Sequence, residues 1–256
     1  MPRRKLYDAF AGGFKVEDIE EGEDRVSSIL EQVIRESKRS MFRGCLPVLM
    51  LDSYGARTAR AAAAASSLVE KVAARENYRC YLRCHVYARS LSEVKRLVAG
   101  VRKHCVIVSV ESTSREITAF ACRDRRVDIV TVVPGVTQAI PRGDLLYAID
   151  RGRIFELTLS HLLGGDKLEI ARRLSSTLPV VRKLTQKGLP LILSSGPRLP
   201  YTPASYRATL SFAKEVLEIP TDVVARSMGP VLESRIRQNL EKISGLRPVE
   251  GVIIES

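Results

Sequence analysis

Short apolar runs recur along the chain and are separated by longer segments that mix apolar and polar residues. The runs are continuous, which is typical of parallel strands that are buried on both faces. Their lengths and their flanking turn residues also favour strands over buried helices. The predicted strands are Lys5–Phe10, Leu46–Leu51, Cys80–Val86, Val106–Val110, Val127–Val133, Ile154–Leu159 and Leu189–Leu193.

The intervening segments predict helices, and several have a recognisable start. Ser90 is followed three residues later by Glu93, which is the spacing of a capping box, and Thr113 with Glu116 repeats it. The acidic stretch Val16–Asp24 has no helical period and predicts a loop. The predicted helices are Asp24–Ser40, Arg57–Arg75, Ser90–Arg102, one from Thr113, Arg142–Asp150, Asp166–Lys187 and one from Thr202, with Pro203 at its first position.

Strands and helices alternate in these predictions, with successive strands roughly 22 to 37 residues apart. This is the βαβ rhythm of a parallel sheet, and the length of 256 residues suits a (β/α)8 barrel. A doubly wound open sheet is the alternative. The eighth strand is not evident, because Val216–Ile219 is short and Val249–Ile254 suits an extension. We predict one domain, an α/β barrel over residues 1–243, and a C-terminal extension over residues 244–256.

The charge balance points to a polyanionic partner. The net charge is +12, which favours nucleic acid first and a membrane surface second. Aromatic residues are only 5% and Trp is absent, which disfavours a stacking platform for single strands. We find no signal peptide and no apolar run of the ~18 residues that cross a bilayer, so we expect a cytoplasmic protein without membrane contact. Abundant Arg with few Asn and Gln suggests a thermophilic source.

The cysteines give no chemical signal in the sequence. They lie mostly inside apolar runs, and we predict buried free thiols in a reducing compartment rather than disulfides. The five cysteines are Cys45, Cys80, Cys84, Cys105 and Cys122.

Catalytic and metal-binding patterns are almost absent. His85, His104 and His161 fall at separate element ends, without the pairing of a zinc motif. A phosphate-binding loop, a dinucleotide fingerprint and a GxSxG elbow are all missing from the sequence. We therefore predict no catalytic residue and no metal bound by the protein.

Glu111, Asp128 and Glu156 are carboxylates that lie in or beside predicted strands. By the barrel rule, Glu111 at the end of its strand is the one candidate active-site group, whereas Asp128 lies at the start of its strand, on the opposite rim. Glu156 falls within a strand, and if it points inward it needs an Arg or Lys partner.

Basic residues carry the stronger signal, because arginine suits bidentate contacts to phosphates and to the A-form backbone of RNA. The turn Ser194-Ser195-Gly196 could offer hydroxyl and amide donors to a phosphate, or it could be purely structural. We predict that RNA is contacted by Arg115, Arg123, Arg142, Lys167, Arg172, Arg173, Ser194, Ser195, Arg198 and Arg207.

The stretch Gly188–Phe212 resembles a family motif. It reads as a strand, the turn Leu193-Ser194-Ser195-Gly196, and a proline-led helix, and in this it is similar to RNase P protein component 3, the thirty-kilodalton RNase P subunit of archaea and eukaryotes. The chain departs from the family where Pro197 replaces the usual Ala and where Tyr201-Thr202-Pro203 replaces Arg-x-Pro. Further matches, in the expected order, are Val110-Glu111-Ser112, Val127–Val130, Phe155-Glu156-Leu157 before Leu162-Leu163, and Leu217–Pro220 with Ala225–Pro230.

This resemblance implies a distorted TIM-like barrel and a role in removing the 5′ leader from precursor tRNA. It also implies that catalysis and the magnesium ions reside on the RNA subunit, so that the isolated chain is not catalytic. The implied partners are RNase P RNA, precursor tRNA, the ferredoxin-like component 2 in a heterotetramer, and other RNase P proteins. Two alternatives stay open: a stand-alone RNA-binding module, and a metal-dependent phosphoesterase with Asp8, Asp52, His85 and Glu111 as ligands.

Overall fold

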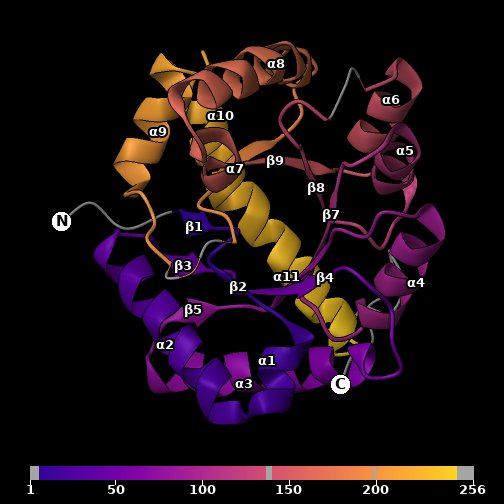
Figure 1. Ribbon diagram of the computed structural model, residues 1–256, viewed down its shortest axis with the longest axis vertical. Coiled ribbons are helices and arrows are strands. Elements are labelled where there is room, and N and C mark those ends of the chain that lie inside the picture. The colour runs from indigo at the N-terminus through magenta and orange to yellow at the C-terminus, as the bar shows by residue number, and fades with distance from the viewer. Residues whose placement is uncertain (1–5, 137–139, 198, 200, 247–256) are drawn as a thin grey trace.

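A computed structural model of the protein describes residues 6–136, 140–197, 199 and 201–246 (Figure 1). Its centre is a curled, fully parallel seven-stranded sheet with the strand order β10-β9-β8-β7-β6-β4-β2. The result is a distorted TIM-like barrel, as predicted. The strands are β2 Gly13–Phe14, β4 Val48–Leu51, β6 Arg83–Val86, β7 Ile107–Glu111, β8 Ile129–Thr131, β9 Ile154–Thr158 and β10 Leu191–Ser194.

The two ends of this sheet meet and close the barrel. Ala11, just before β2, forms a parallel bridge with Gly196, just after β10. The amide of Gly196 donates to the carbonyl of Phe10 at 2.9 Å, and the amide of Gly12 donates to the carbonyl of Gly196 at 3.3 Å. The eighth strand of the predicted barrel is not found among the described residues. Val216 ends a helix, so Val216–Ile219 is not a strand, and Val249–Ile254 lies outside the described residues.

Each of the first three strands of the fold is divided into two short ones. The prediction covered both parts only at Cys80–Val86, because Gly13–Phe14 and Gly44–Cys45 lie outside the predicted strands Lys5–Phe10 and Leu46–Leu51. The N-terminal halves form a separate three-stranded parallel sheet in the order β1-β3-β5. Between β3 and β4 stands Pro47, which has no N–H to donate to a ladder. These halves are β1 Tyr7–Asp8, β3 Gly44–Cys45 and β5 Arg79–Cys80.

Helices cover the outside of the barrel, and local capping chemistry sets several of their starts (Figure 1). The hydroxyl of Ser90 accepts from the amide of Glu93, and the Asp166 carboxylate accepts from the amide of Glu169, as predicted. The helices are α1 Val16–Glu21, α2 Glu23–Arg39, α3 Thr58–Arg75, α4 Leu91–Val101, α5 Arg115–Arg123, α6 Arg142–Asp150, α7 Leu159–Leu163, α8 Lys167–Gln186, α9 Tyr206–Glu215, α10 Thr221–Arg226, the π-helical turn η1 Ser227–Val231, and α11 Leu232–Ile243.

Three expectations about helices were wrong. The segment predicted as an acidic loop begins with α1, whose residues Val16 and Ile19 pack against the core. Helix α5 is capped by Ser114 rather than Thr113, because the Ser114 hydroxyl accepts from the amide of Ile117. Helix α9 starts three residues later than predicted, since Ser205 supplies its cap instead of Thr202.

The C-terminal helix closes one end of the barrel. Figure 1 shows α11 crossing the molecule diagonally. Its Asn239 side chain donates to the carbonyl of Val106 at 2.9 Å and to Asp128 at 3.0 Å, at the starts of β7 and β8. The hydroxyl of Ser227, in η1, accepts from the amide of Leu191 at the start of β10. The opposite end, where the strands finish, is the upper rim.

The cysteines divide into two groups. Cys84 in β6 and Cys105 before β7 are joined by a disulfide, so the prediction of free thiols was wrong for these two. Strand pairing brings them together, and the sequence gives no sign of it. Cys45, Cys80 and Cys122 are free and buried, as predicted.

Among the described residues, no helix is both long enough and apolar enough to span a bilayer.

Candidate functional site

A network of charged and hydroxyl side chains fills the inside of the barrel. Two guanidinium nitrogens of Arg83 in β6 donate to the carboxylate of Glu156 in β9, with an Nη1–Oε1 distance of 2.6 Å. Thr131 and Ser194 donate to the same carboxylate at 2.7 and 2.8 Å. Both charged side chains are 0% exposed. The ion pair confirms that Glu156 needs a basic partner.

The carboxylate of Glu156 is held in its charged form at neutral pH. Burial by itself would raise the pKa of Glu156, but the charge of Arg83 and the hydrogen bonds from Arg83, Thr131 and Ser194 lower that pKa below its usual value. The ring of Phe10 lies 4.5 Å from the guanidinium carbon of Arg83 and completes its enclosure. Both side chains are hydrogen-bonded to their neighbours and closed off from water. The pair therefore stabilises the structure and is not a reactive site.

Above this pair, a second polar contact lies nearer the upper rim. The Nε2 of His85 is 3.0 Å from the carboxylate of Glu111, and its Nδ1 is 3.0 Å from the hydroxyl of Ser109. Burial lowers the pKa of His85, although Glu111 opposes the shift. The imidazole is therefore neutral at pH 7, with Nε2–H donating to Glu111. Glu111 lies at the end of its strand as predicted, and Asp128 lies at the opposite end of the barrel.

The ligand set of the phosphoesterase alternative does not assemble. Asp8 accepts from the amides of Phe10 and Ser195, and Asp52 is exposed and accepts from Tyr87, so only His85 and Glu111 meet. Within the part of the chain that the structure describes, no group of three or more His, Cys, Asp or Glu side chains is placed to hold a metal. The described residues at this site offer no metal centre, and the hydroxyl beside the imidazole, that of Ser109, is buried and already bonded to Arg83 and to the carbonyl of Cys84.

The Ser194-Ser195-Gly196 turn closes the barrel instead of facing outward. Ser194 is 2% exposed and donates to Glu156. Ser195 donates to Asp8, which is wholly buried and also accepts from Tyr201. Burial raises the pKa of Asp8, although the hydrogen bonds from Ser195 and Tyr201 oppose the shift. Both serine side chains are thus committed inside the molecule, which argues against the predicted RNA contact by Ser194.

Exposed cations line the upper rim over four consecutive strands. Arg115, Arg142, Lys167 and Arg207 are the first or second residues of α5, α6, α8 and α9, which follow β7, β8, β9 and β10 in turn. All four side chains are exposed, and none forms an ion pair with a described carboxylate. Residues at these helix starts also lie beside the partial positive charge of unpaired backbone amides. We call these four residues the basic rim.

The remaining predicted RNA contacts have different surroundings. Arg172 is exposed on α8. Arg123 pairs with Asp144 at 2.7 Å, and Arg173 donates to the carbonyl oxygens of His161 and Gly164, so both already serve the fold. Arg198 lies outside the described residues.

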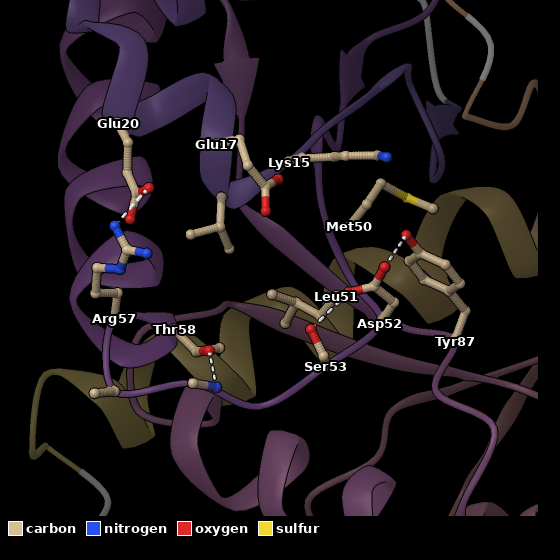
Figure 2. Close-up of a pocket in the computed structure, with 13 residues that line it drawn as sticks. Lys15, Glu17, Glu20, Met50, Leu51, Asp52, Ser53, Arg57, Thr58 and Tyr87 are labelled. Atoms are coloured by element: carbon tan, nitrogen blue, oxygen red, sulfur yellow. Dashed lines mark hydrogen bonds and ion pairs between the residues drawn. The ribbon is translucent and has the colours of Figure 1, made fainter.

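The other side of the upper rim is acidic. A pocket of about 370 Å³ opens beside β2, β4 and β6, and Figure 2 shows the carboxylates of Glu17, Glu20 and Asp52 around it. Arg57 pairs with Glu20 at 2.9 Å and so adds no free charge. Partial burial and the Asp52 carboxylate raise the pKa of Tyr87 to about 12. Lys15 also lines the pocket, so three carboxylates face two cations and the net charge is negative, which disfavours phosphate on this side.

The barrel fold is shared with known proteins. The family model for RNase P subunit p30 matches residues 27–218, well over half of the chain. The chain belongs to the RNase P subunit p30 family. It is therefore a protein subunit of ribonuclease P. A comparison with curated proteins finds no match.

Solved structures agree on the architecture of this p30-family chain. A chain in the cryo-EM structure of archaeal ribonuclease P with mature tRNA matches at 16% identity and a TM-score of 0.70, with 98% of each chain covered. Molinate hydrolase matches at 10% identity and a TM-score of 0.54, over 92% of this chain and 73% of the other. At these identities the similarity shows the fold, and the hydrolase likeness is not evidence of hydrolytic activity.

Sequence reasoning missed two features of this p30-family subunit. Arg83 was not singled out, although an arginine in the middle of an apolar strand is a sign of a buried ion pair. The acidic pocket was also missed, because Glu17 and Glu20 lie in a segment predicted as a loop and Asp52 follows a different element, β4. Among these residues, only Arg83 carried a signal in the sequence that could have revealed it.

Proposed function

We propose that this RNase P subunit binds RNA with the basic rim and contributes structure, rather than catalytic groups, to the removal of the 5′ leader from precursor tRNA. The observation that carries the proposal is the placement of Arg115, Arg142, Lys167 and Arg207 at four neighbouring helix starts on one rim. Arg172 extends this surface along α8.

Physical chemistry supports this face over the others. When a cation of the basic rim contacts a phosphate, counterions condensed on the RNA are released, and this release favours binding. Arginine forks also fit the phosphates of an A-form backbone, which proteins recognise by shape. The carboxylates of the acidic pocket repel phosphates from the β2–β6 side, so RNA is oriented over β7–β10. The lower end is covered by α11.

The absence of reactive groups fits catalysis by RNA. The described residues offer no metal cluster, and the charged groups Arg83 and Glu156 inside the barrel are bound to each other. We therefore propose that the magnesium ions lie on the RNA subunit and that the protein relieves phosphate repulsion where RNA strands pack closely. The proposed protein partners are the ferredoxin-like component 2, in a heterotetramer, and the other RNase P proteins, in the cytoplasm.

Two variants test the proposal: one removes the four charges of the basic rim, and the other removes four charges from other helices. Replacing Arg115, Arg142, Lys167 and Arg207 by Ala should weaken binding to RNase P RNA and reduce the log–log salt slope by roughly 0.7 to 0.9 for each phosphate that is no longer bound. The matched control replaces four exposed cations on α2, α3 and α4, namely Arg35, Arg60, Lys71 and Arg96, by Ala. It removes the same charge and should change the slope much less. Equal losses of affinity in both variants would show that only net charge matters. That result would overturn the proposal that the basic rim binds RNA.

A further inference from the structure

Two free thiols lie face to face in the small lower sheet. Cys45 in β3 and Cys80 in β5 are paired residues of neighbouring parallel strands. Their sulfur atoms are 3.1 Å apart. Cys45 is 0% exposed and Cys80 is 6% exposed. The register of the two strands places these cysteines opposite each other, because each cysteine is part of its strand.

We propose that Cys45 and Cys80 are a dithiol modification site, which a small-molecule disulfide oxidises to a second intramolecular disulfide. Neighbouring strands are about 4.8 Å apart, and disulfides span Cα separations of roughly 4.4 to 6.8 Å. A sulfur–sulfur bond is about 2.05 Å long, so the two sulfurs need to approach by about 1 Å from their contact of 3.1 Å. No change of fold is needed for that movement.

Access for the oxidant comes from one side. A pocket of about 390 Å³ between α3, β5 and α11 is lined by Cys80, together with Tyr78, Tyr81 and Leu240. Cys45 does not line this pocket and is wholly enclosed. The arrangement gives the two thiols separate roles: Cys80 meets the oxidant, and Cys45 resolves the intermediate from behind.

The oxidation proceeds in two thiol–disulfide exchange steps, in which one disulfide is reduced and another is formed. The Cys80 thiolate attacks one sulfur of a disulfide RSSR, forming a Cys80–S–S–R mixed disulfide and releasing RS⁻, which takes up the proton lost by Cys80. Cys45 then attacks the Cys80 sulfur, the S–S bond of the mixed disulfide breaks, and the departing RS⁻ takes the Cys45 proton. The dithiol loses two electrons and RSSR becomes two RSH. Burial raises the pKa of the Cys45 thiol, so its proton has to pass to the departing thiolate as Cys45 attacks.

The bond would add to the cross-link already present. Cys45 and Cys80 are 35 residues apart and enclose α3, while Cys84 and Cys105 are 21 residues apart and enclose α4. Together the two bonds would tie three successive strand–helix units of the barrel. Cross-linking a loop of this length restricts the unfolded chain, so oxidation should raise Tm by roughly 5–10 °C.

Peptide mapping of the full chain tests the proposal. The reduced protein is folded, treated with oxidised glutathione, denatured in iodoacetamide and digested with trypsin. Cleavage after Arg83 separates Cys80 from Cys84, so the two bonds give different products. We expect residues 44–57 joined to residues 80–83, with Cys122 alkylated. Cys45 and Cys80 both alkylated, Cys80 carrying only glutathione, or either thiol joined to another cysteine would each overturn the proposal.

Variants keep the result independent of one substitution. Cys80→Ala should lose the cross-linked peptide and the part of the Tm rise that depends on it, while Cys122→Ala should keep both. Cys122 is the matched control because it is free and buried, on α5 away from the pair. If the oxidation-dependent Tm rise were the same in Cys80→Ala and wild type, the Cys45–Cys80 bond would not be its source. Wild-type peptide mapping decides the question even if Cys80→Ala fails to fold.

Discussion

At the residue scale, the fold depends on charges that are buried in the barrel rather than on its surface ion pairs. Arg83 and Glu156 are fully enclosed, whereas pairs such as Arg39–Glu36 are exposed. Exposed pairs contribute about 0–1 kcal/mol, but breaking a buried pair leaves a charge without a partner. The stability of the molecule should therefore respond far more to substitutions at Arg83 and Glu156.

Replacing Glu156 by Gln should lower the free energy of unfolding by about 3–5 kcal/mol, because the Arg83 charge stays buried without its counterion. The measurement is urea unfolding followed by circular dichroism. Glu36→Gln is the control, since its carboxylate is in an ion pair on the surface. It should cost less than about 1 kcal/mol. Similar losses of stability in the two variants would contradict the importance of the buried pair.

The same substitution should also change the acid response. The pKa of Glu156 is lowered in the folded protein, so its stabilising contribution is fully present above pH 4.5, the usual value for Glu. That contribution is lost as the pH falls through the lower folded-state pKa. Wild type should therefore lose stability below pH 4.5 more steeply than Glu156→Gln. Parallel curves for the two proteins would show that Glu156 does not contribute to this acid sensitivity.

At the element scale, the turn after β10 decides whether the barrel is closed. Ser195 binds Asp8, and Gly196 bridges to Ala11 with a φ of 101°. That φ value favours glycine, and a Cβ at Gly196 would overlap the side chain of Ser160. The predicted contact motif therefore works as a seam between the first and last strands.

Two substitutions in this turn should differ in cost. Ser195→Ala removes a hydrogen bond to a buried carboxylate and should lower the free energy of unfolding by about 1–3 kcal/mol. Gly196→Ala should cost more, because strain and overlap add to the broken seam. RNA affinity, measured where each variant is folded, should stay near that of wild type. A stable Ser195→Ala protein with weakened RNA binding would restore the contact-surface interpretation.

At the scale of the whole molecule, the division of the upper rim into acidic and basic sides suits a subunit that organises RNA. The isolated chain should cleave no precursor tRNA with magnesium present, and cleavage should need the RNA subunit. The assay compares protein alone, RNA alone and the reconstituted enzyme. Glu111→Gln is the control, because Glu111 is the one carboxylate that pairs with His85 at the rim. Magnesium-dependent cleavage by the pure protein that is lost in Glu111→Gln would contradict catalysis by RNA.

Local chemistry by itself determined many of the elements. The bounds of α6 and the caps Ser90 and Asp166 were predicted from neighbouring residues. Such features depend on periodicity and on hydrogen bonds within a few residues, which the sequence displays directly. The family resemblance was likewise confirmed, since the family model matches residues 27–218, which include the motif at Gly188–Phe212.

Only the tertiary structure decided the features that join distant segments. Arg83 as the partner of Glu156, the Cys84–Cys105 disulfide and the inward turn of Ser195 toward Asp8 all depend on how parallel strands are placed in register. A closed barrel brings the first and last strands together, so seven strands suffice and the turn at Gly196 becomes a seam. Register and closure are settled by the packing of the whole core, which no local pattern encodes.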